Sequence, residues 1–462
     1  MKRPTLVLFL ILLLAFLVRV TMLIVNYNNL DFDGSFYEQG EIASNIIAGK
    51  GMTLSTIHLE RILTLSRSRH KMLDFQDVPP IAGEDVHADF NNEPGYGIFL
   101  AALWEITGSE RWIYPRIIQI LIDVLMCYII FVVASQLFST KVGIAASLFY
   151  AIFIPQIEMT IRPYRDVWVT YLFVVSIWYM LTMKRSSSKP WKLYFETASV
   201  GLFAATVCWM RSTVLIYPLA LAGGLFLITQ KRQWWRFSAV LLIVFVIAYA
   251  PFVYRSNETF GKPMATRGAF WHSFWGGIGQ FKNPYGVVED DKKIFDFAKS
   301  IDPQVEFDTP EYEQVLKKKA FELLRDHPLF YVATVVRRAV VIAFPRFGRA
   351  LLMQKTPQVE RIGALNQVGH LGETALMLVD FGIGALFVVG VWIQKKKVES
   401  LVIVVLPFLY TLVTLAPFYV TGRNIANSYC SEIIVASVGL VFVAEKIGLL
   451  HKSLYGSQST LG

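Results

Sequence analysis

The sequence has few charged residues and almost no cysteine. Only 17% of its 462 residues are charged, whereas 54% are hydrophobic and 14% are aromatic, and the mean hydropathy is +0.47. This composition excludes an ordinary soluble domain and is typical of a polytopic membrane protein. The three cysteines, Cys127, Cys208 and Cys430, lie in apolar stretches. We therefore expect them to be small buried side chains rather than disulfide partners or metal ligands.

The sequence also lacks a solvated basic domain and a cleavage site near its start. Its net charge of +9 is therefore better explained by anionic lipid and by the positive-inside bias than by a nucleic-acid partner. Residues 4–26 form an apolar run that is interrupted only by Arg19. This run is too long for the core of a signal peptide, and no A-x-A site follows it, so we expect an uncleaved first span in the lipid bilayer.

Ten apolar runs are long enough to cross a membrane. We therefore expect an all-α polytopic membrane protein, a bundle of about 10–12 transmembrane helices with helical outer loops. The expected spans are residues 4–26, 111–137, 141–160, 164–183, 192–210, 212–230, 236–254, 374–394, 399–420 and 428–448.

Basic residues between these spans predict their orientation. With a cytoplasmic N-terminus, nearly all the short basic loops fall on the cytoplasmic side. Two further apolar segments, 94–107 and 328–345, do not fit the alternation, and we expect both to lie in the interface or to re-enter. A crossing at 328–345 paired with one near 349–373 would preserve the same charge bias. The basic loop residues are Lys141, Lys184, Arg185, Lys189, Lys231, Arg232, Arg236, Lys395, Lys396, Lys397, Lys446 and Lys452.

Three parts of the chain follow from this layout. We expect an N-terminal transmembrane module at 1–254, which contains a first outer loop at 27–110, then a large outer loop with interfacial helices at 255–373, and C-terminal transmembrane helices at 374–462. Within the large loop, Thr309 followed by Pro310 predicts a helix start, because threonine caps helices and proline suits the first helical position. No internal repeat is present.

Acids and arginines gather on the outer face of this predicted topology. Asp31 and Asp33 follow the first span, and Glu93 precedes Tyr96 in a Pro-Gly-Tyr segment. The arginines and the remaining acid lie at later outer turns: Arg162, Arg165, Asp166, Arg211, Arg255 and Arg423. An acid that accepts a proton and arginines that hold phosphate would suit chemistry on a lipid-linked phosphate.

The chain resembles the polyprenyl-phosphate-sugar-dependent glycosyltransferases of the GT-C superfamily, close to the protein mannosyltransferases and lipid A aminoarabinose transferases of glycosyltransferase family 39. Four passages in family order carry this resemblance: Asp31–Tyr37 with Asn45 and Gly49–Gly51; Glu93–Leu100 with Arg116–Gln119; Arg255–Lys262 with Phe274–Gly277; and Ala320 with His327–Tyr331 and Arg337–Arg338.

The resemblance implies an inverting transfer of a sugar from a polyprenyl-phosphate donor to a lipid, glycan or protein acceptor. A carboxylate then takes the acceptor proton, and Asp33 is our first choice, Asp31 the second, ahead of capping or solvated-loop roles. The same two acids would hold Mg²⁺ or Mn²⁺ if a divalent ion is used. Asp166 is a candidate second acid, although it could equally form a local ion pair with Arg165.

The other candidates would contact substrate. Arg165, Arg211 and Arg255 are candidate phosphate ligands, although an arginine at a span end more often reaches toward headgroups. Glu93, with Tyr96, could orient the acceptor, but an acid that stabilises a helix start is the simpler interpretation of Glu93. The setting we expect is a bacterial inner membrane, with the active site on its outer side.

Two other functions stay open. A polytopic transporter or flippase would place charges or broken helices near mid-membrane and often shows internal repeats, whereas this chain has its acids at the outer boundary. An oligosaccharide polymerase or ligase of the cell envelope would share basic outer loops but need no acid directly after the first span. Replacing Asp33 with asparagine would separate that mechanism from the glycosyltransferase.

Overall fold

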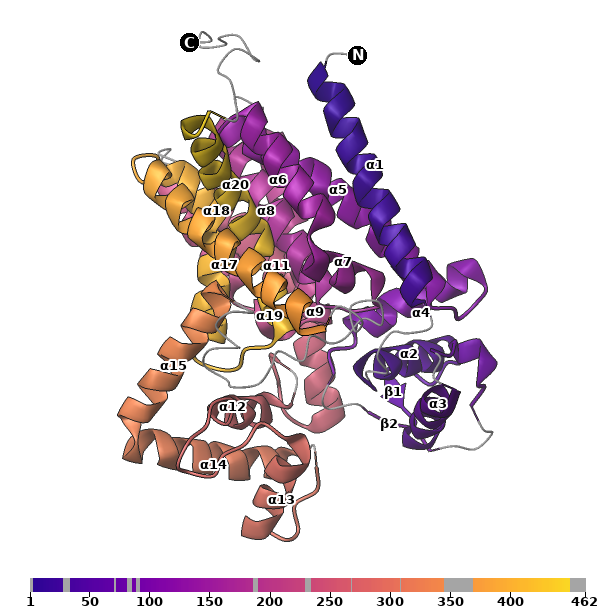
Figure 1. The fold of residues 1–462 in the computed structure, drawn as a ribbon. Coiled ribbons are helices and arrows are strands. Elements are labelled where there is room, and N and C mark those ends of the chain that lie inside the picture. Colours follow the sequence, from indigo (N-terminus) through magenta and orange to yellow (C-terminus); the bar gives the residue numbers. More distant parts are fainter. Residues whose placement is uncertain are drawn as a thin grey trace.

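The computed structural model is a bundle of long helices with two helical segments at one end (Figure 1). It describes residues 3–27, 34–69, 72–80, 85–88, 92–185, 190–228, 234–266, 268–307, 309–344 and 369–448. Helix α1 (Arg3–Asn26) begins, and α20 (Tyr429–Lys446) ends, at the upper end in Figure 1. Helices α2 (Gly34–Ile47) and α12 (Phe270–Ile278) lie at the opposite end, which we call the cavity end.

The predicted spans correspond to helices of the bundle. These are α1, α5 (Ile113–Leu137), α6 (Thr140–Ile152), α7 (Ile154–Ile161), α8 (Val167–Arg185), α9 (Pro190–Met210), α10 (Tyr217–Ile228), α11 (Trp234–Phe260), α17 (Gly369–Gln394), α18 (Val398–Leu415) and α20. The helical membrane bundle that composition predicts is therefore confirmed. All three cysteines are buried and unpaired, as their apolar surroundings indicate.

Fewer helices than ten are long and apolar enough to cross a membrane. In the described part of the chain, seven helices have the length and the composition of a membrane span, or eight if α6 and α7 together form one bent span. The predicted span 212–230 is a short 3₁₀ turn, η2 (Ser212–Val214), followed by α10 of only 12 residues. The predicted span 428–448 corresponds to α20, which is not among these seven helices and contains the charged residues Glu432, Glu445 and Lys446.

The break between α6 and α7 bends the chain by 53° and has an identifiable cause. Pro155 has no N–H group, so the carbonyl of Ala151 loses the partner that a continuous helix would provide. The guanidinium of Arg19, the charge that interrupts the first apolar run, donates instead to Ala151 O at 2.9 Å and to Tyr150 O at 3.3 Å. The same guanidinium contacts Asp123 of α5, with Nε 2.6 Å from Oδ2.

This buried Arg19–Asp123 pair is enclosed by further polar groups. Asp123 Oδ1 also accepts hydrogen bonds from Tyr150 Oη at 2.6 Å and from Gln156 Nε2 at 2.7 Å, and both charged side chains are fully buried. Because a charge in a bundle interior is tolerated only when it is paired and hydrogen-bonded, these contacts explain how α1 holds an arginine.

The two segments at the cavity end are packed differently. The first contains α2, the strands β1 (Thr53–Leu54) and β2 (His87–Ala88), α3 (Thr56–Arg69), the 3₁₀ turn η1 (Phe75–Asp77) and α4 (Gly95–Thr107), and its buried Phe36, Tyr37 and Trp104 belong to the core of the bundle. The second contains α12, α13 (Asp291–Ile301), α14 (Pro310–Asp326) and α15 (Pro328–Ala343), and has a separate core. We call α12–α15 the outer unit.

Local capping and amphipathic faces define the outer unit. The predicted start of α14 is confirmed, because Thr309 Oγ1 accepts a hydrogen bond from Tyr312 N at 3.3 Å and Pro310 opens the helix. Helix α15 exposes Leu329, Val332 and Val336, although it buries Arg338. An exposed apolar stripe at this spacing favours the predicted interfacial position of 328–345. Within the outer unit, α15 is the helix that extends toward the bundle (Figure 1). The division of the chain into three parts stays a prediction.

Candidate active site

A cavity of about 610 Å³ lies between the bundle and the outer unit. Its wall draws on α2, on the turn before α8, on η2, on α12 and on the segment between α18 and α20. This volume is in the range of small-molecule sites, and such sites commonly lie where two units of a protein meet. The cavity therefore brings together side chains from parts of the chain that are far apart in sequence.

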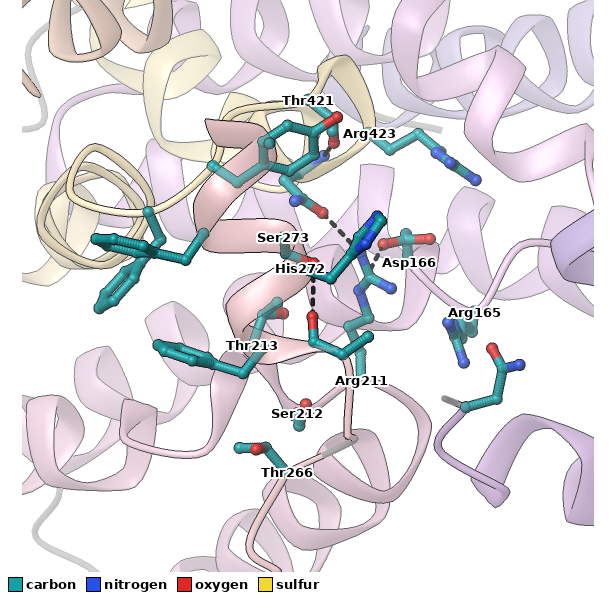
Figure 2. Close-up of a pocket in the computed structure, with 18 of the residues that line it drawn as sticks. Arg165, Asp166, Arg211, Ser212, Thr213, Thr266, His272, Ser273, Thr421 and Arg423 are labelled. Carbon is teal, nitrogen blue, oxygen red and sulfur yellow. Dashed lines mark hydrogen bonds and ion pairs between the residues drawn. The ribbon is translucent and has the colours of Figure 1, made fainter. Parts of the chain in front are cut away.

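Arg211 and Asp166 form the first of two ion pairs at this cavity. Arg211 Nε lies 3.0 Å from Asp166 Oδ1, and Arg211 Nη2 donates to Asn424 Oδ1 at 3.1 Å. Figure 2 shows Asp166 and Arg211 pointing toward one another, with Arg165 and Arg423 on either side. The Arg211 side chain keeps 13% exposure and Asp166 keeps 4%, so the cation reaches the cavity while its carboxylate partner is nearly buried.

Arg165 and Glu93 form the second ion pair. Arg165 Nη1 lies 3.1 Å from Glu93 Oε2, and Glu93 Oε1 accepts hydrogen bonds from Ser212 N at 3.0 Å and from Ser212 Oγ at 2.5 Å. The carboxylate of Glu93 thus meets the first N–H of η2 as well as a guanidinium. The two adjacent residues Arg165 and Asp166 pair with Glu93 and Arg211 instead of with each other, so the structure does not support the alternative of a local ion pair between them.

Arg423 is a third cation at the cavity. It lies on α19 (Gly422–Ala426), whose first turn is capped by Thr421 Oγ1 accepting from Asn424 N at 3.2 Å. The Arg423 guanidinium carbon lies 5.1 Å from the centre of the Tyr164 ring, which is a cation–π distance. Arg165, Arg211 and Arg423 therefore line one cavity from three separate segments, and we call them the arginine wall.

The opposite side of the cavity belongs to the outer unit. Ring nitrogens of His272 lie 2.6 Å from Tyr312 Oη and 3.0 Å from Asp291 Oδ1. The hydrogen bond with His272 lowers the pKa of Asp291 from its ordinary value. Both oxygens of Glu313 accept from backbone N–H groups at the start of α12, Trp271 N at 2.6 Å and His272 N at 3.0 Å. A carboxylate at a helix N-terminus stabilises that helix.

Residues 416–424, which we call the strap, connect the outer unit to the arginine wall. The Gln280 amide donates to Val420 O at 2.7 Å and accepts from Val420 N at 3.1 Å. Arg338 Nη1 donates to the carbonyls of Ala416 at 3.0 Å and Pro417 at 2.9 Å. Because the strap also carries Asn424, the outer unit fixes the residue that holds Arg211.

The predicted site residues fall into three groups. Arg165, Asp166 and Arg211 line the cavity, and Glu93 contacts two of its lining residues. The helix-start interpretation of Glu93 is not supported, because its contacts are with η2 and Arg165 rather than with the first turn of α4.

Two predicted substrate ligands lie elsewhere. Tyr96 is fully buried in α4, with its hydroxyl 3.3 Å from Gln119 Oε1, and Arg255 Nη2 donates to Met52 O at 3.1 Å, tying α11 to the first outer segment. Neither residue lines the cavity.

Asp31 and Asp33 lie outside the described residues, so their roles as base or metal ligands stay predictions. Within the described ranges, no group of three or more histidine, cysteine, aspartate or glutamate side chains is arranged to hold a metal ion. Gly34, which follows Asp33, begins α2, and Phe36 and Glu38 of that helix line the cavity.

Several residues that line the cavity were not expected from the sequence. Ser212 and Asn424 each follow a cavity arginine, and the run Glu289, Asp290 and Asp291 leads into α13, whose first residue is Asp291. Their positions beside other polar residues, at the predicted outer turns, could have indicated from the sequence that they lie near the site. Which of them faces the cavity depends on packing against other elements.

Comparisons with known proteins were made for sequence and for structure. Residues 91–254 match the family model described as dolichyl-phosphate-mannose-protein mannosyltransferase. No curated protein matches the chain.

Among solved structures, an oligosaccharyltransferase of Archaeoglobus fulgidus tethered to an acceptor peptide is similar over 97% of this chain and 50% of its own, with 12% identity and a TM-score of 0.52. The structure of the same enzyme with an inhibitory peptide and a dolichol-phosphate covers 98% of this chain and 52% of its own, with 11% identity and a TM-score of 0.51. The chain thus spans about half the length of these oligosaccharyltransferases.

ArnT of Cupriavidus metallidurans bound to undecaprenyl phosphate covers 95% of this chain and 79% of its own, with 13% identity and a TM-score of 0.39. Residues 91–254 are thus similar to a family of membrane mannosyltransferases, and the chain shares its fold with the archaeal oligosaccharyltransferase.

Proposed function

We propose that this enzyme transfers a sugar from a polyprenyl-phosphate donor to an acceptor hydroxyl or amine in the cavity between the bundle and the outer unit. The observation that carries the proposal is the arginine wall, three cations that line one cavity at the end of a membrane bundle. When the glycosidic bond to the donor breaks, negative charge develops on the departing phosphate. Guanidinium groups placed at that phosphate lower the barrier, because they stabilise the charge as it forms.

Arg211 is the cation that we place on the donor phosphate. Asp166 and Asn424 fix its position from two sides, and its side chain still reaches the cavity. A charge fixed before the reaction stabilises the transition state without a cost of reorganisation. In this proposal Asp166 positions Arg211 and is not the base, because its carboxylate already faces a guanidinium.

Asp33 is the base in this proposal, with Asp31 as the alternative. In the sequence Asp33 directly precedes Gly34, the first residue of α2. Helix α2 supplies Phe36 and Glu38 to the cavity, and this neighbourhood in sequence supports the choice of Asp33. The carboxylate takes the acceptor proton while the new bond to the anomeric carbon forms, and the polyprenyl phosphate leaves from the opposite side of the sugar, which inverts that carbon.

We place the reaction on the non-cytoplasmic side of the membrane. At the end where α1 begins, Lys141 pairs with Glu445 at 2.8 Å and Lys184 pairs with Glu399 at 2.9 Å. Three further lysines, Lys395–Lys397, join α17 to α18. Basic residues are enriched on the cytoplasmic side, so the opposite, cavity end faces outward.

The donor class is supported by two comparisons. The description of the family model names dolichyl-phosphate-mannose, and the structure of the archaeal oligosaccharyltransferase contains a dolichol-phosphate. A membrane lipid, a glycan or a protein is the acceptor in this proposal, and a bacterial inner membrane is its setting.

The test uses purified protein in detergent with radiolabelled polyprenyl-phosphate sugars and extracted membrane lipid as acceptor. Wild type and Asp33→Asn are compared for release of sugar from the donor, with and without EDTA. We expect release by the wild type and its loss in a folded Asp33→Asn variant; sensitivity to EDTA would assign a divalent ion to the site. Equal release by the two proteins would remove Asp33 from the mechanism, and no release with any donor would favour the transporter.

A further inference from the structure

A second cavity, of about 320 Å³, lies beside the first on the outer unit. It is formed where the end of α11 and the segment after it meet the starts of α12 and α14. We call it the side groove, and its central residues are Phe260, Lys262, Phe270, Trp271, Gln314 and Lys317.

The side groove combines positive charge with aromatic surface. Lys262 and Lys317 are exposed, and neither forms an ion pair with a carboxylate in the part of the chain that the structure describes. Lys317 Nζ lies 5.7 Å from the centre of the Trp271 ring. Glu313, the acid in the groove, accepts from the backbone of Trp271 and His272, so its charge is directed to the start of α12.

The groove adjoins the cavity that holds the arginine wall. Thr266 and Phe270 line both spaces, and Figure 2 shows Thr266 among the side chains of the first cavity. The rim before Thr266 is fixed to α11, because Tyr249 Oη donates to Ala265 O at 2.8 Å and Met264 N donates to Ser256 Oγ at 2.8 Å. The two spaces therefore share one wall, and contacts with α11 fix the backbone of this wall.

We propose that the side groove is the binding site for an anionic saccharide, the part of the acceptor that lies beyond the reacting group. Ammonium groups bind phosphate or carboxylate, and the face of an indole ring packs against a sugar ring, so the groove offers both contacts to one ligand. That this saccharide is part of the acceptor rests on the function proposed above. The binding of an anionic saccharide rests on the groove alone and can be measured without donor or turnover.

Glucose 6-phosphate is a suitable probe, and Trp271 provides a signal inside the groove. Full-length protein is labelled with fluorotryptophan in detergent, and Trp271→Phe assigns the ¹⁹F resonance of Trp271. We expect a saturable shift of that resonance with glucose 6-phosphate, a weaker response to inorganic phosphate, and none to glucose at the same concentration. The double variant Lys262→Gln with Lys317→Gln should bind at least about tenfold more weakly, since it loses charge-assisted contacts.

Lys318→Gln is the control for the change at Lys317, because it removes one positive charge from an exposed neighbour on α14 that lines neither cavity. It should bind glucose 6-phosphate like the wild type. Absence of a saturable shift, or unchanged binding by the double variant, would overturn the proposal. Equal affinity for inorganic phosphate would overturn the saccharide part. If the groove fails these tests while Asp33→Asn abolishes sugar release, only the groove assignment falls, and the proposed reaction stands.

Discussion

Two arginine–aspartate pairs of this protein differ in their surroundings. Arg19 and Asp123 are fully buried in the bundle, and carbonyl, phenol and amide groups complete their hydrogen bonds. Arg211 and Asp166 lie at the cavity, where Asn424 adds one contact and the cation stays partly exposed. The comparison indicates that enclosure, rather than the pair itself, separates a charge that holds helices together from one that can meet a substrate.

The largest expected effect comes from breaking the buried pair. Asp123→Asn leaves the Arg19 cation uncompensated in the bundle, and we expect the free energy of unfolding to fall by about 3–5 kcal/mol. Denaturation of the purified protein in mixed micelles, followed by tryptophan fluorescence, measures this loss. The double variant Arg19→Met with Asp123→Leu removes both charges and should recover most of the stability; an equally unstable double variant would contradict the explanation.

Breaking the cavity pair should change activity instead. Arg211→Gln removes a cation from the developing phosphate charge, and we expect sugar release to slow by about 10²–10³-fold, as for other fixed charges that stabilise a transition state. The unfolding midpoint should move far less than in Asp123→Asn, because the side chain already reaches the cavity. A variant that loses stability but keeps its rate per folded molecule would make this pair structural.

A smaller effect is expected from the strap. Gln280→Ala removes both hydrogen bonds to Val420, and we expect a loss of about 1–2 kcal/mol in stability. Since Asn424 lies on the same segment, the rate constant of sugar release should also fall, while the KM of the donor changes less. Gln304→Ala, at an exposed position of the outer unit, is the control. Identical kinetics in the two variants would show that the strap does not position Arg211.

The smallest effect is a pH dependence at Asp291. Its pKa is lower in the folded protein than in the unfolded chain, so its contact with His272 stabilises the fold above about pH 4. This contribution is lost as the pH falls through the lower, folded-state pKa. Wild type should therefore lose more stability than Asp291→Asn as the pH falls below about 4, when unfolding is followed at each pH. Asp296→Asn on the same helix serves as the comparison, and coincident curves would argue against the contact.

For much of the site, the sequence predicts at which end of the bundle the residues lie. Arg165, Asp166, Arg211 and Arg423 all lie at turns between apolar runs, and alternation of the runs assigns these turns to one face. The structure places all four at one cavity. Arg255 follows the same rule but contacts Met52 instead, because position along the membrane axis does not specify the direction of a side chain.

The membrane bundle, most of its spans and the end at which acids and arginines gather follow from local features of the chain, namely run length, hydropathy and loop charge. The pairing of Arg165 with Glu93, of Arg211 with Asp166 and of Arg19 with Asp123 depends on the folded arrangement of the helices. These partners lie on segments far apart in sequence, and which side chains face one another depends on how the helices pack. The side groove arises for the same reason, since α11, α12 and α14 form it only when the outer unit is folded against the end of α11.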